Sequence, residues 1–380
     1  MAATLSIRRI LVGEGSAEPV RGLRFARELF GAAPTEFVFG VRRTDEGLAA
    51  IDQPGVSLLA AFPGRGLARF GQPTRCCSLS ASGIQRVLAT RRLRADALVV
   101  VAAPAGSDGS RSLGTVNGCM QAAVDAAPLV VIEEDPSLPL LAGAARIPAD
   151  KPVWVLQHEP AAYRALSRSA DPVDQACAEH IAGLLADDIT LQLGVGGPIE
   201  ALGSPLRQRR RLRIVTGAIG SSLRELHANG CLAVDAPVLG TALVGDDELV
   251  AWARRTPQLT LGPSSQVHNP KWLAAQPRFH SINVAISVDL AGNVNAEWAG
   301  RRRISGPGGA PDFARGARLS RGWAAIVALR ADRGGALVER IARPTIPAAY
   351  VDFVVCERGV ADLRGKDIRE RSAALTKLLG

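Results

Sequence analysis

The sequence predicts an α/β protein with two open halves, each built on a parallel sheet. Short apolar runs rich in β-branched residues alternate with alanine- and leucine-rich amphipathic stretches, a pattern typical of strands separated by helices. The chain has 380 residues, of which 47% are hydrophobic. A chain of this size can bury substantial cores, so we expect two domains or two similar halves rather than one.

Three apolar runs in the first half predict buried strands: Ala97–Ala102, Leu129–Ile132 and Val153–Leu156. Parallel strands need a crossover between them, and Asn117–Ala127 supplies a helix between the first two runs. Its many small residues allow the helix to pack closely on a sheet.

The segment Asp171–Ala186 predicts the clearest helix in the chain. Asp171 can cap it, a proline follows in the first turn, and apolar residues recur at helical spacing. A new strand is predicted at Thr190–Leu193. We place the boundary between the halves near this helix, which gives an N-terminal α/β domain, 1–186, and a C-terminal α/β domain, 187–380.

The composition limits the class of partner and the compartment. A net charge of +9 favours anionic partners, and both coenzyme A and nucleic acid qualify. The basic runs Arg207–Arg213 and Arg301–Arg303 contain no aromatic residue, so we interpret them as solvated arginines, and nucleic acid is not the expected partner. No apolar run is long enough for a membrane span and no signal peptide is visible, which predicts a cytoplasmic protein without a membrane partner.

Neither cysteine nor histidine shows the spacing of a metal site. The six cysteines are scattered, and the adjacent Cys76 and Cys77 do not form a CxxC pair. The five histidines show no HExxH or paired arrangement. We therefore expect reduced thiols and no metal.

A glycine-rich turn follows the predicted strand. Leu191–Gly197 (LQLGVGG) runs into Gly194, Gly196 and Gly197, and the next residues can open a helix. Such a turn brings backbone N–H groups close to an anionic or carbonyl oxygen, so it is a candidate oxyanion or phosphate cradle. A dinucleotide fingerprint is disfavoured, because Ile199 breaks the GxGxxG spacing and no acidic residue follows at the required distance.

The C-terminal part carries a more specific signal. Ser281–Gly309 reads SINVAISVDLAGNVNAEWAGRRRISGPGG and continues as APDFARGARLSRGWAAIVAL, and Cys356–Arg371 reads CERGVADLRGKDIRER. These segments resemble the acetyl-CoA hydrolase/CoA-transferase family, whose patterns are close to INSAIEVDLxGxVNxE, SGxGGQxDFxRGAxxSxGG and TEYGVADLRGKSxRER. Within that family the chain is similar to the 4-hydroxybutyrate and succinyl/acetate CoA-transferases. The resemblance continues more weakly upstream through Ser112–Asp135.

This resemblance implies two α/β halves of related fold with an acyl-CoA site between them, a coenzyme A thioester as substrate or ligand, and no permanently bound cofactor. Thioester transfer develops negative charge on the acyl oxygen, which preorganised donors in glycine loops and amides can stabilise. The predicted CoA- and oxyanion-binding residues are Gly194, Gly196, Gly197, Asn283, Gly306, Gly308 and Gly309. We expect Asp289 and Asp312 to fix loops by accepting backbone hydrogen bonds. A homodimer, or pairing with an active subunit, is a further expectation.

The nucleophile of the family is missing from its expected place. The family carries HTEMxSDGxxxL, whose glutamate attacks the thioester. The equivalent stretch here is Val215–Leu223 (VTGAIGSSL), where Thr216 matches and Gly217 stands at the glutamate. Two further polar residues differ, since Ser287 and Ala310 replace a glutamate and a glutamine. Glycine offers no nucleophile, so we expect acetyl-CoA to carboxylate exchange to be absent or very slow.

Three interpretations remain open. The chain can bind an acyl-CoA and process it by direct attack of water or an acceptor, with Glu200, Glu297 or Glu357 as general base. It can instead be a noncatalytic acyl-CoA-binding protein or the partner subunit of an active CoA-transferase. The third interpretation is an unrelated role, including nucleic-acid binding.

Overall fold

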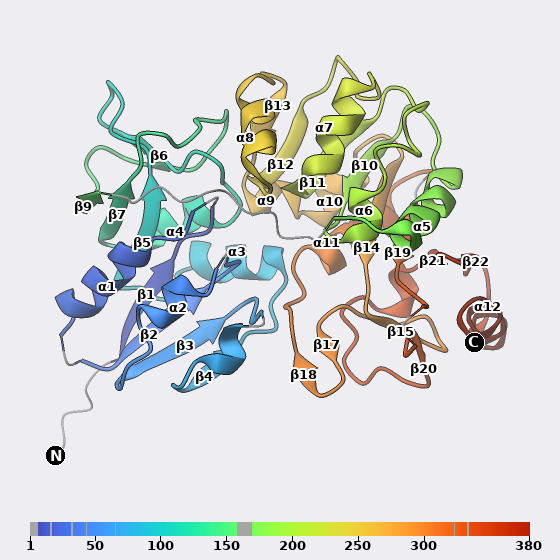
Figure 1. The fold of residues 1–380 in the computed structure, drawn as a ribbon, viewed down its shortest axis with the longest axis horizontal. Coiled ribbons are helices and arrows are strands. Elements are labelled where there is room, and N and C mark those ends of the chain that lie inside the picture. Colours follow the sequence, from blue (N-terminus) through green and yellow to red (C-terminus); the bar gives the residue numbers. More distant parts are fainter. Residues whose placement is uncertain are drawn as a thin grey trace.

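The computed structural model describes residues 7–15, 17–31, 33–42, 44–64, 66–157, 169–322, 324–332 and 334–380. The protein consists of two α/β halves, each organised around its own mainly parallel sheet (Figure 1). The predicted α/β class and two-half arrangement are therefore confirmed. None of the helices among these residues is both long enough and apolar enough to cross a membrane.

The first sheet has seven strands in the order β4-β3-β2-β1-β5-β7-β9, all paired in parallel. The strands are β1 (Arg8–Val12), β2 (Thr35–Phe39), β3 (Val56–Ala60), β4 (Thr74–Cys76), β5 (Ala97–Ala102), β7 (Val130–Glu134) and β9 (Val153–Gln157). The helices of this half are α1 (Val20–Leu29), α2 (Glu46–Ala49), α3 (Ala81–Ala89) and α4 (Met120–Ala126), and β6 (Arg111–Ser112) pairs with β8 (Arg146–Ile147).

Strand β5 shows why its sequence is apolar at every position. Leu98 packs on the face that α4 covers, and its neighbour Val99 packs on the opposite face against Leu23 of α1. A central parallel strand is covered on both faces, so its residues do not alternate between apolar and polar. The predicted bounds Ala97–Ala102 are confirmed.

Two predictions in this half need correction. Val153–Gln157 is a strand, but it is not buried, since Trp154 is 50% exposed. The reason is that β9 forms the outer edge of the sheet, where one side of the strand has no neighbour. The crossover helix begins at Met120 rather than Asn117, because Gly118 adopts a left-handed φ of 47° that interrupts helical geometry.

The second sheet has eight strands in the order β13-β12-β11-β10-β14-β19-β21-β22, and only β22 runs antiparallel to its neighbour. The strands are β10 (Thr190–Leu193), β11 (Arg213–Ile219), β12 (Val238–Leu243), β13 (Leu259–Leu261), β14 (Phe279–Val284), β19 (Ala324–Ala328), β21 (Phe353–Cys356) and β22 (Gly359–Asp362). The helices are α5 (Pro172–Gly183), α6 (Gly197–Glu200), α7 (Ser221–Ala228), α8 (Asp247–Arg254), α9 (Ser264–Val267), α10 (Pro270–Ala274), α11 (Ala310–Leu319) and α12 (Ile368–Leu379).

Short strands extend the second half beyond its main sheet. These are β15 (Ser287–Asp289), β16 (Val294–Asn295) and β20 (Leu337–Val338) in one small sheet, and β17 (Trp298–Ala299) and β18 (Arg302–Arg303) in another. Figure 1 shows β17 and β18 in orange beside the first half, facing β4. This hairpin therefore lies where the two halves approach each other.

Helix α5 begins as the sequence predicts. Asp171 caps it and forms a capping box with Asp174, each carboxylate accepting a backbone N–H from the other residue. Its buried face packs with strands of the second sheet, in the same core as Leu191 and Val355. The domain boundary between residues 186 and 187 stays a prediction, although α5 packs with the second half.

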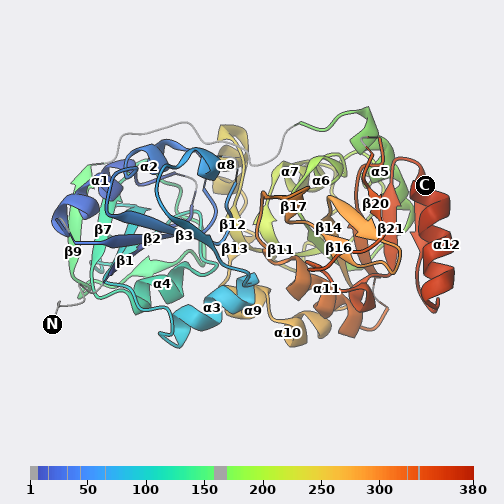
Figure 2. The ribbon, with the colours of Figure 1, turned by 90° about the horizontal axis from the view of Figure 1, so that it is seen from below.

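Part of the contact between the halves comes from a loop of the first half. The loop before α4 pairs with the second half through single bridges between Val116 and Ala242 and between Gly118 and Pro263. Figure 2 shows α3 of the first half beside α9 of the second. These contacts hold the loop before α4 and helix α3 against the second half.

Candidate functional site

A cleft of about 760 Å³ lies between the halves. Its volume falls in the range of small-molecule sites. The first half lines it with Cys76, Ser78 and Ser80, and the second half with Glu297, Trp298, Arg303, Pro307, Pro311, Arg343, Pro344 and Thr345. The lining therefore contains two arginines and several hydroxyl groups, and it borders the second glycine loop at residues 306–309.

The second glycine loop connects the two halves. A Cβ atom on Gly306 would overlap the carbonyl oxygen of Ala61, so only glycine allows this approach of the two chains. Gly308 has a φ of 58°, and its carbonyl oxygen accepts a hydrogen bond of 2.8 Å from the N–H of Ala81 at the start of α3. Two of the predicted glycines thus hold the loop against the first half.

Asp312 strengthens the same connection. From the first turn of α11 its carboxylate accepts hydrogen bonds from Ser80 Oγ (3.1 Å), Ser82 N (3.1 Å) and Ser82 Oγ (2.6 Å). Burial raises the pKa of Asp312, and the donors on Ser82 and Ser80 lower it again in part. Asp289 has the equivalent role within the second half, where it accepts the N–H groups of Asn293 and Ile341. The predicted loop-fixing roles of both aspartates are confirmed.

Gly217 lies on β11 beside a buried histidine. A Cβ atom at this position would be 3.4 Å from Nε2 of His268 and 3.6 Å from Cε2 of Phe313. A Cβ atom on Gly309 would overlap the same imidazole and lie 2.7 Å from Phe313. The His268 ring therefore occupies the space between Gly217 and the second glycine loop.

A short chain of neutral groups extends from this imidazole to the first half. His268 Nδ1 lies 3.1 Å from Ser264 Oγ, and Cys119 Sγ lies 3.5 Å from the same hydroxyl. Burial lowers the pKa of His268 to about 4 and raises the pKa of Cys119 to about 12. Both side chains are thus neutral at pH 7, and Cys119 lacks the thiolate that a nucleophilic cysteine requires.

The first glycine turn is built by close packing. The N–H of Gly194 donates to the carbonyl oxygen of Ile282 at 2.8 Å, so this donor already has a partner. A Cβ atom on Gly197 would overlap the carboxylate of Asp174, and Gly196 has a φ of 143° at the start of α6. The role of Gly194, Gly196 and Gly197 in binding CoA or an oxyanion stays a prediction.

Asn283 lies in the same region on β14. Its side chain is buried, and its Oδ1 atom accepts a hydrogen bond of 3.5 Å from Nε2 of Gln192 on β10. Because β10 and β14 are paired, the two amides lie next to each other inside the sheet layer. The predicted contact of Asn283 with a ligand stays a prediction.

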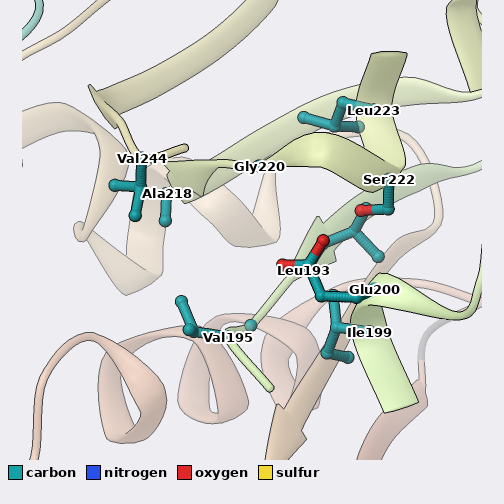
Figure 3. Close-up of a pocket in the computed structure, with 10 residues that line it drawn as sticks. Leu193, Val195, Ile199, Glu200, Ala218, Gly220, Ser222, Leu223 and Val244 are labelled. Carbon is teal, nitrogen blue, oxygen red and sulfur yellow. The ribbon is translucent and has the colours of Figure 1, made fainter. Parts of the chain in front are cut away.

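Glu200 lies beside a very small pocket. Figure 3 shows its carboxyl group and the hydroxyl of Ser222 on the same side of this space, whose volume of about 10 Å³ suits roughly one water molecule. Ala218 also lines the pocket. Since adjacent strand residues face opposite sides of a sheet, the pocket lies on the other face of β11 from the imidazole beside Gly217.

Glu297 lines the cleft but is held there by structural contacts. Its carboxylate forms a 2.6 Å ion pair with Arg303 and accepts a 3.0 Å hydrogen bond from Thr345 Oγ1. Glu357 is remote, since β21 is four strands from β11, or roughly 19 Å at the usual strand spacing. Its carboxylate accepts the N–H of Ala331. Glu357 therefore lies far from Gly217, whereas the roles of Glu200 and Glu297 as general bases stay predictions.

Sequence reasoning missed the residues that surround Gly217. His268 and Ser264 belong to the short segment around α9, and Phe313 belongs to α11. No motif marks His268, which is a single histidine before an Asn-Pro helix start. Only the packing of three separate elements around one ring reveals it.

Comparisons with known proteins identify the family. Residues 245–379 match the acetyl-CoA hydrolase/transferase C-terminal domain. The chain is also 30% identical over 301 residues to the 4-hydroxybutyrate coenzyme A transferase of Clostridium kluyveri, a match that covers 76% of this chain and 70% of that enzyme. The chain belongs to the acetyl-CoA hydrolase/transferase family. Another member of the family, the succinyl-CoA:cyclohexane-1-carboxylate CoA transferase of Geobacter metallireducens, is 27% identical, with 67% of this chain and 62% of that one covered.

Solved structures share the fold along nearly the whole chain. RipA from Yersinia pestis superposes with a TM-score of 0.88 at 22% identity, covering 98% of this chain and 91% of that one. The 4-hydroxybutyrate CoA-transferase from Porphyromonas gingivalis gives a TM-score of 0.79 at 22% identity, with 99% and 91% covered. The two halves of this acetyl-CoA hydrolase/transferase family member are thus arranged as in those proteins.

Proposed function

We propose that this protein binds a coenzyme A thioester in the cleft between its halves and does not exchange it through a glutamyl thioester. The family supports the class of ligand, since its members carry names of CoA-transferases and an acetyl-CoA hydrolase. The cleft has the volume, the arginines and the neighbouring glycine loop that such a ligand requires.

One observation carries the second part of the proposal. The space beside Gly217 holds the imidazole of His268 and the ring of Phe313, both almost completely buried. A carboxylate at position 217 would need that space for its remaining atoms and would lose its hydration there. The packing thus fits a chain in which residue 217 contributes no nucleophile.

A calorimetric titration tests the binding part directly. We expect coenzyme A and acetyl-CoA to bind with one site per chain, and adenosine 5′-monophosphate, which lacks the pantetheine arm, to bind much more weakly. The absence of binding by every CoA derivative would refute the proposal.

An isotope-exchange assay tests the chemistry. Labelled acetate mixed with unlabelled acetyl-CoA should remain unincorporated in the presence of the protein, because the glutamyl intermediate cannot form at Gly217. Rapid incorporation by the unaltered chain would show that another residue acts as nucleophile.

Slow hydrolysis is a second candidate function, and the position of Glu297 favours it. Among the three predicted acids, Glu297 lines the large cleft and could activate a water molecule there. Glu297→Gln should then abolish release of free CoA while CoA still binds. Thr345→Val is the control, because it removes a hydrogen bond to the same carboxylate and leaves the charge in place. An equal loss in both variants would indicate a structural effect.

A further inference from the structure

The first half contains an apolar cavity that the cleft does not include. Its volume is about 200 Å³, and most of its surface is apolar. The ends of β1, β2 and β3 form its floor, and α3 and α4 cover it. Its lining includes Leu11, Val38, Leu59, Ile84, Leu88 and Met120.

The cavity lies where open α/β sheets bind ligands. In the order β4-β3-β2-β1-β5-β7-β9, the strand sequence reverses between β1 and β5. Ligands of such sheets bind outside the carboxyl ends of the strands, next to the reversal. Leu11 and Val12 at the end of β1 line the cavity, so it begins beside this position and extends from there along the ends of β2 and β3.

The cavity and the cleft share one wall. Cys76, Ser78 and Ser80 line the cleft, whereas Cys77 and Leu79 line the cavity. Side chains alternate in this way along an extended chain. The segment 76–80 therefore presents hydroxyl and thiol groups to one space and mainly apolar atoms to the other.

The cavity also reaches the neighbourhood of Gly217. Cys119 lines it, and its thiol contacts Ser264, which is hydrogen-bonded to His268. One side of the cavity is thus only two side chains away from the imidazole beside Gly217. Burial raises the pKa of Cys119 and keeps its thiol neutral, although the carboxylate of Glu14 also lines the cavity.

We propose that the cavity receives the apolar acyl chain of the thioester whose coenzyme A part lies in the cleft. This inference rests on the proposed function and names its substrate class. An apolar cavity of about 150 Å³ holds one benzene molecule, so a space of this size suits an acyl chain of roughly six to eight carbons. Acetyl groups would leave it empty, and polar acyl groups would lose their hydration in it.

A chain-length series tests the inference. Calorimetric titrations with CoA and with its acetyl, butyryl, hexanoyl, octanoyl and dodecanoyl thioesters should show a gain of roughly fourfold in affinity for each added methylene up to the hexanoyl or octanoyl thioester. The gain should then stop, because longer chains exceed the cavity. Equal affinities across the series would overturn the inference and leave CoA binding untouched, whereas failure of CoA itself to bind would refute the proposed function.

Two variants of α4 separate the cavity from the rest of the molecule. Ala123→Leu adds apolar atoms to the cavity lining and should abolish the gain with chain length, with the affinity for CoA unchanged. Ala126→Leu places the same change on the same helix outside the cavity and should keep the gain. Leu79→Trp, on the shared wall, repeats the test should Ala123→Leu fail to fold. Binding of free octanoate as tight as that of its thioester, or an unchanged gain in both filled variants, would overturn the inference.

Discussion

His268 lies between two glycines that leave its ring different amounts of room. A Cβ atom on Gly309 would overlap the imidazole, whereas one on Gly217 would make ordinary contact at 3.4 Å. We therefore expect Gly309→Ala to reduce the free energy of unfolding by about 1–3 kcal/mol through overpacking, and Gly217→Ala to have a much smaller effect. Urea denaturation of both variants measures the difference, and equal losses would contradict this packing.

Introducing a glutamate at position 217 should not be sufficient to create a nucleophile. Gly217→Glu alone would press a carboxylate against His268 and Phe313, so we expect a destabilised protein without acetate exchange. The double variant Gly217→Glu, His268→Ala provides the missing space. Labelled acetate should enter acetyl-CoA with the double variant only, and His268→Ala by itself serves as the control. Robust exchange by the single Glu variant would show that the imidazole moves aside easily.

Two buried groups should give opposite pH dependences of stability. The pKa of His268 falls from 6.5 to about 4, so below pH 6.5 the unfolded chain binds a proton that the folded chain does not, and stability is lost as the pH falls. Burial raises the pKa of Asp352 from 3.8 to about 6, so its stabilising contribution is lost as the pH rises towards 6. The two effects oppose each other between pH 4 and 6, each worth up to about 1.4 kcal/mol per pH unit.

Single substitutions should separate these effects. Relative to the unaltered protein, His268→Gln should gain stability as the pH falls from 6.5 to 4, and Asp352→Asn should gain stability as the pH rises from 4 to 6. Urea denaturation at several pH values within this window gives both slopes. If the free energy of unfolding had the same pH dependence in both variants, one of the two groups would lack the pKa shift that its burial predicts.

At the scale of elements, the sequence predicted where the strands lie better than it predicted which strands are exposed to solvent. The apolar run Ala97–Ala102 lies in the middle of a sheet, whereas the apolar run Val153–Leu156 belongs to its edge strand. Apolar composition cannot distinguish these cases, because the neighbour of a parallel strand comes from a distant part of the chain. The sequence could not predict the position of His268 for the same reason, because its contacts come from β11 and α11, which are separate in the chain.

The link between α11 and α3 should control the motion of the cleft wall. Asp312→Ala removes acceptors for three donors on Ser80 and Ser82, at a cost of about 1–3 kcal/mol. We expect amide hydrogen exchange at the start of α3 to become on the order of tenfold faster. Asp289→Ala is the matched control, because it also removes the acceptors of three backbone N–H groups, all within the second half. Faster exchange of α3 in that control would show that the effect is global.

At the scale of the whole molecule, the family motifs predicted the loops beside the cleft but not the apolar cavity of the first half. Gly306 and Gly308 lie where the halves meet, as the resemblance implied for a site between two halves. No sequence pattern indicated the apolar cavity, because its lining comes from five separate elements of the first half. That half is also the part in which the family pattern is weakest, so neither motif nor periodicity could define it.

The charge of the whole molecule leads to a last prediction. With a net charge of +9 and with Arg303 and Arg343 in the cleft lining, the protein should attract the phosphates of coenzyme A. The affinity for CoA should therefore fall as salt rises from 20 to 500 mM, roughly the range over which the Debye length shrinks from about 20 to 4 Å. Arg303 already pairs with Glu297, so Arg343 is the better probe.

Arg343→Gln should weaken CoA binding roughly threefold to tenfold and reduce the dependence on salt, because a charge near the rim acts through screened attraction. Arg224→Gln removes the same charge from α7, where the guanidinium pairs with Glu248 outside the cleft lining, and should leave both quantities unchanged. Calorimetry at several salt concentrations compares the two variants. Equal losses would mean that only the net charge matters, and that CoA does not lie beside Arg343.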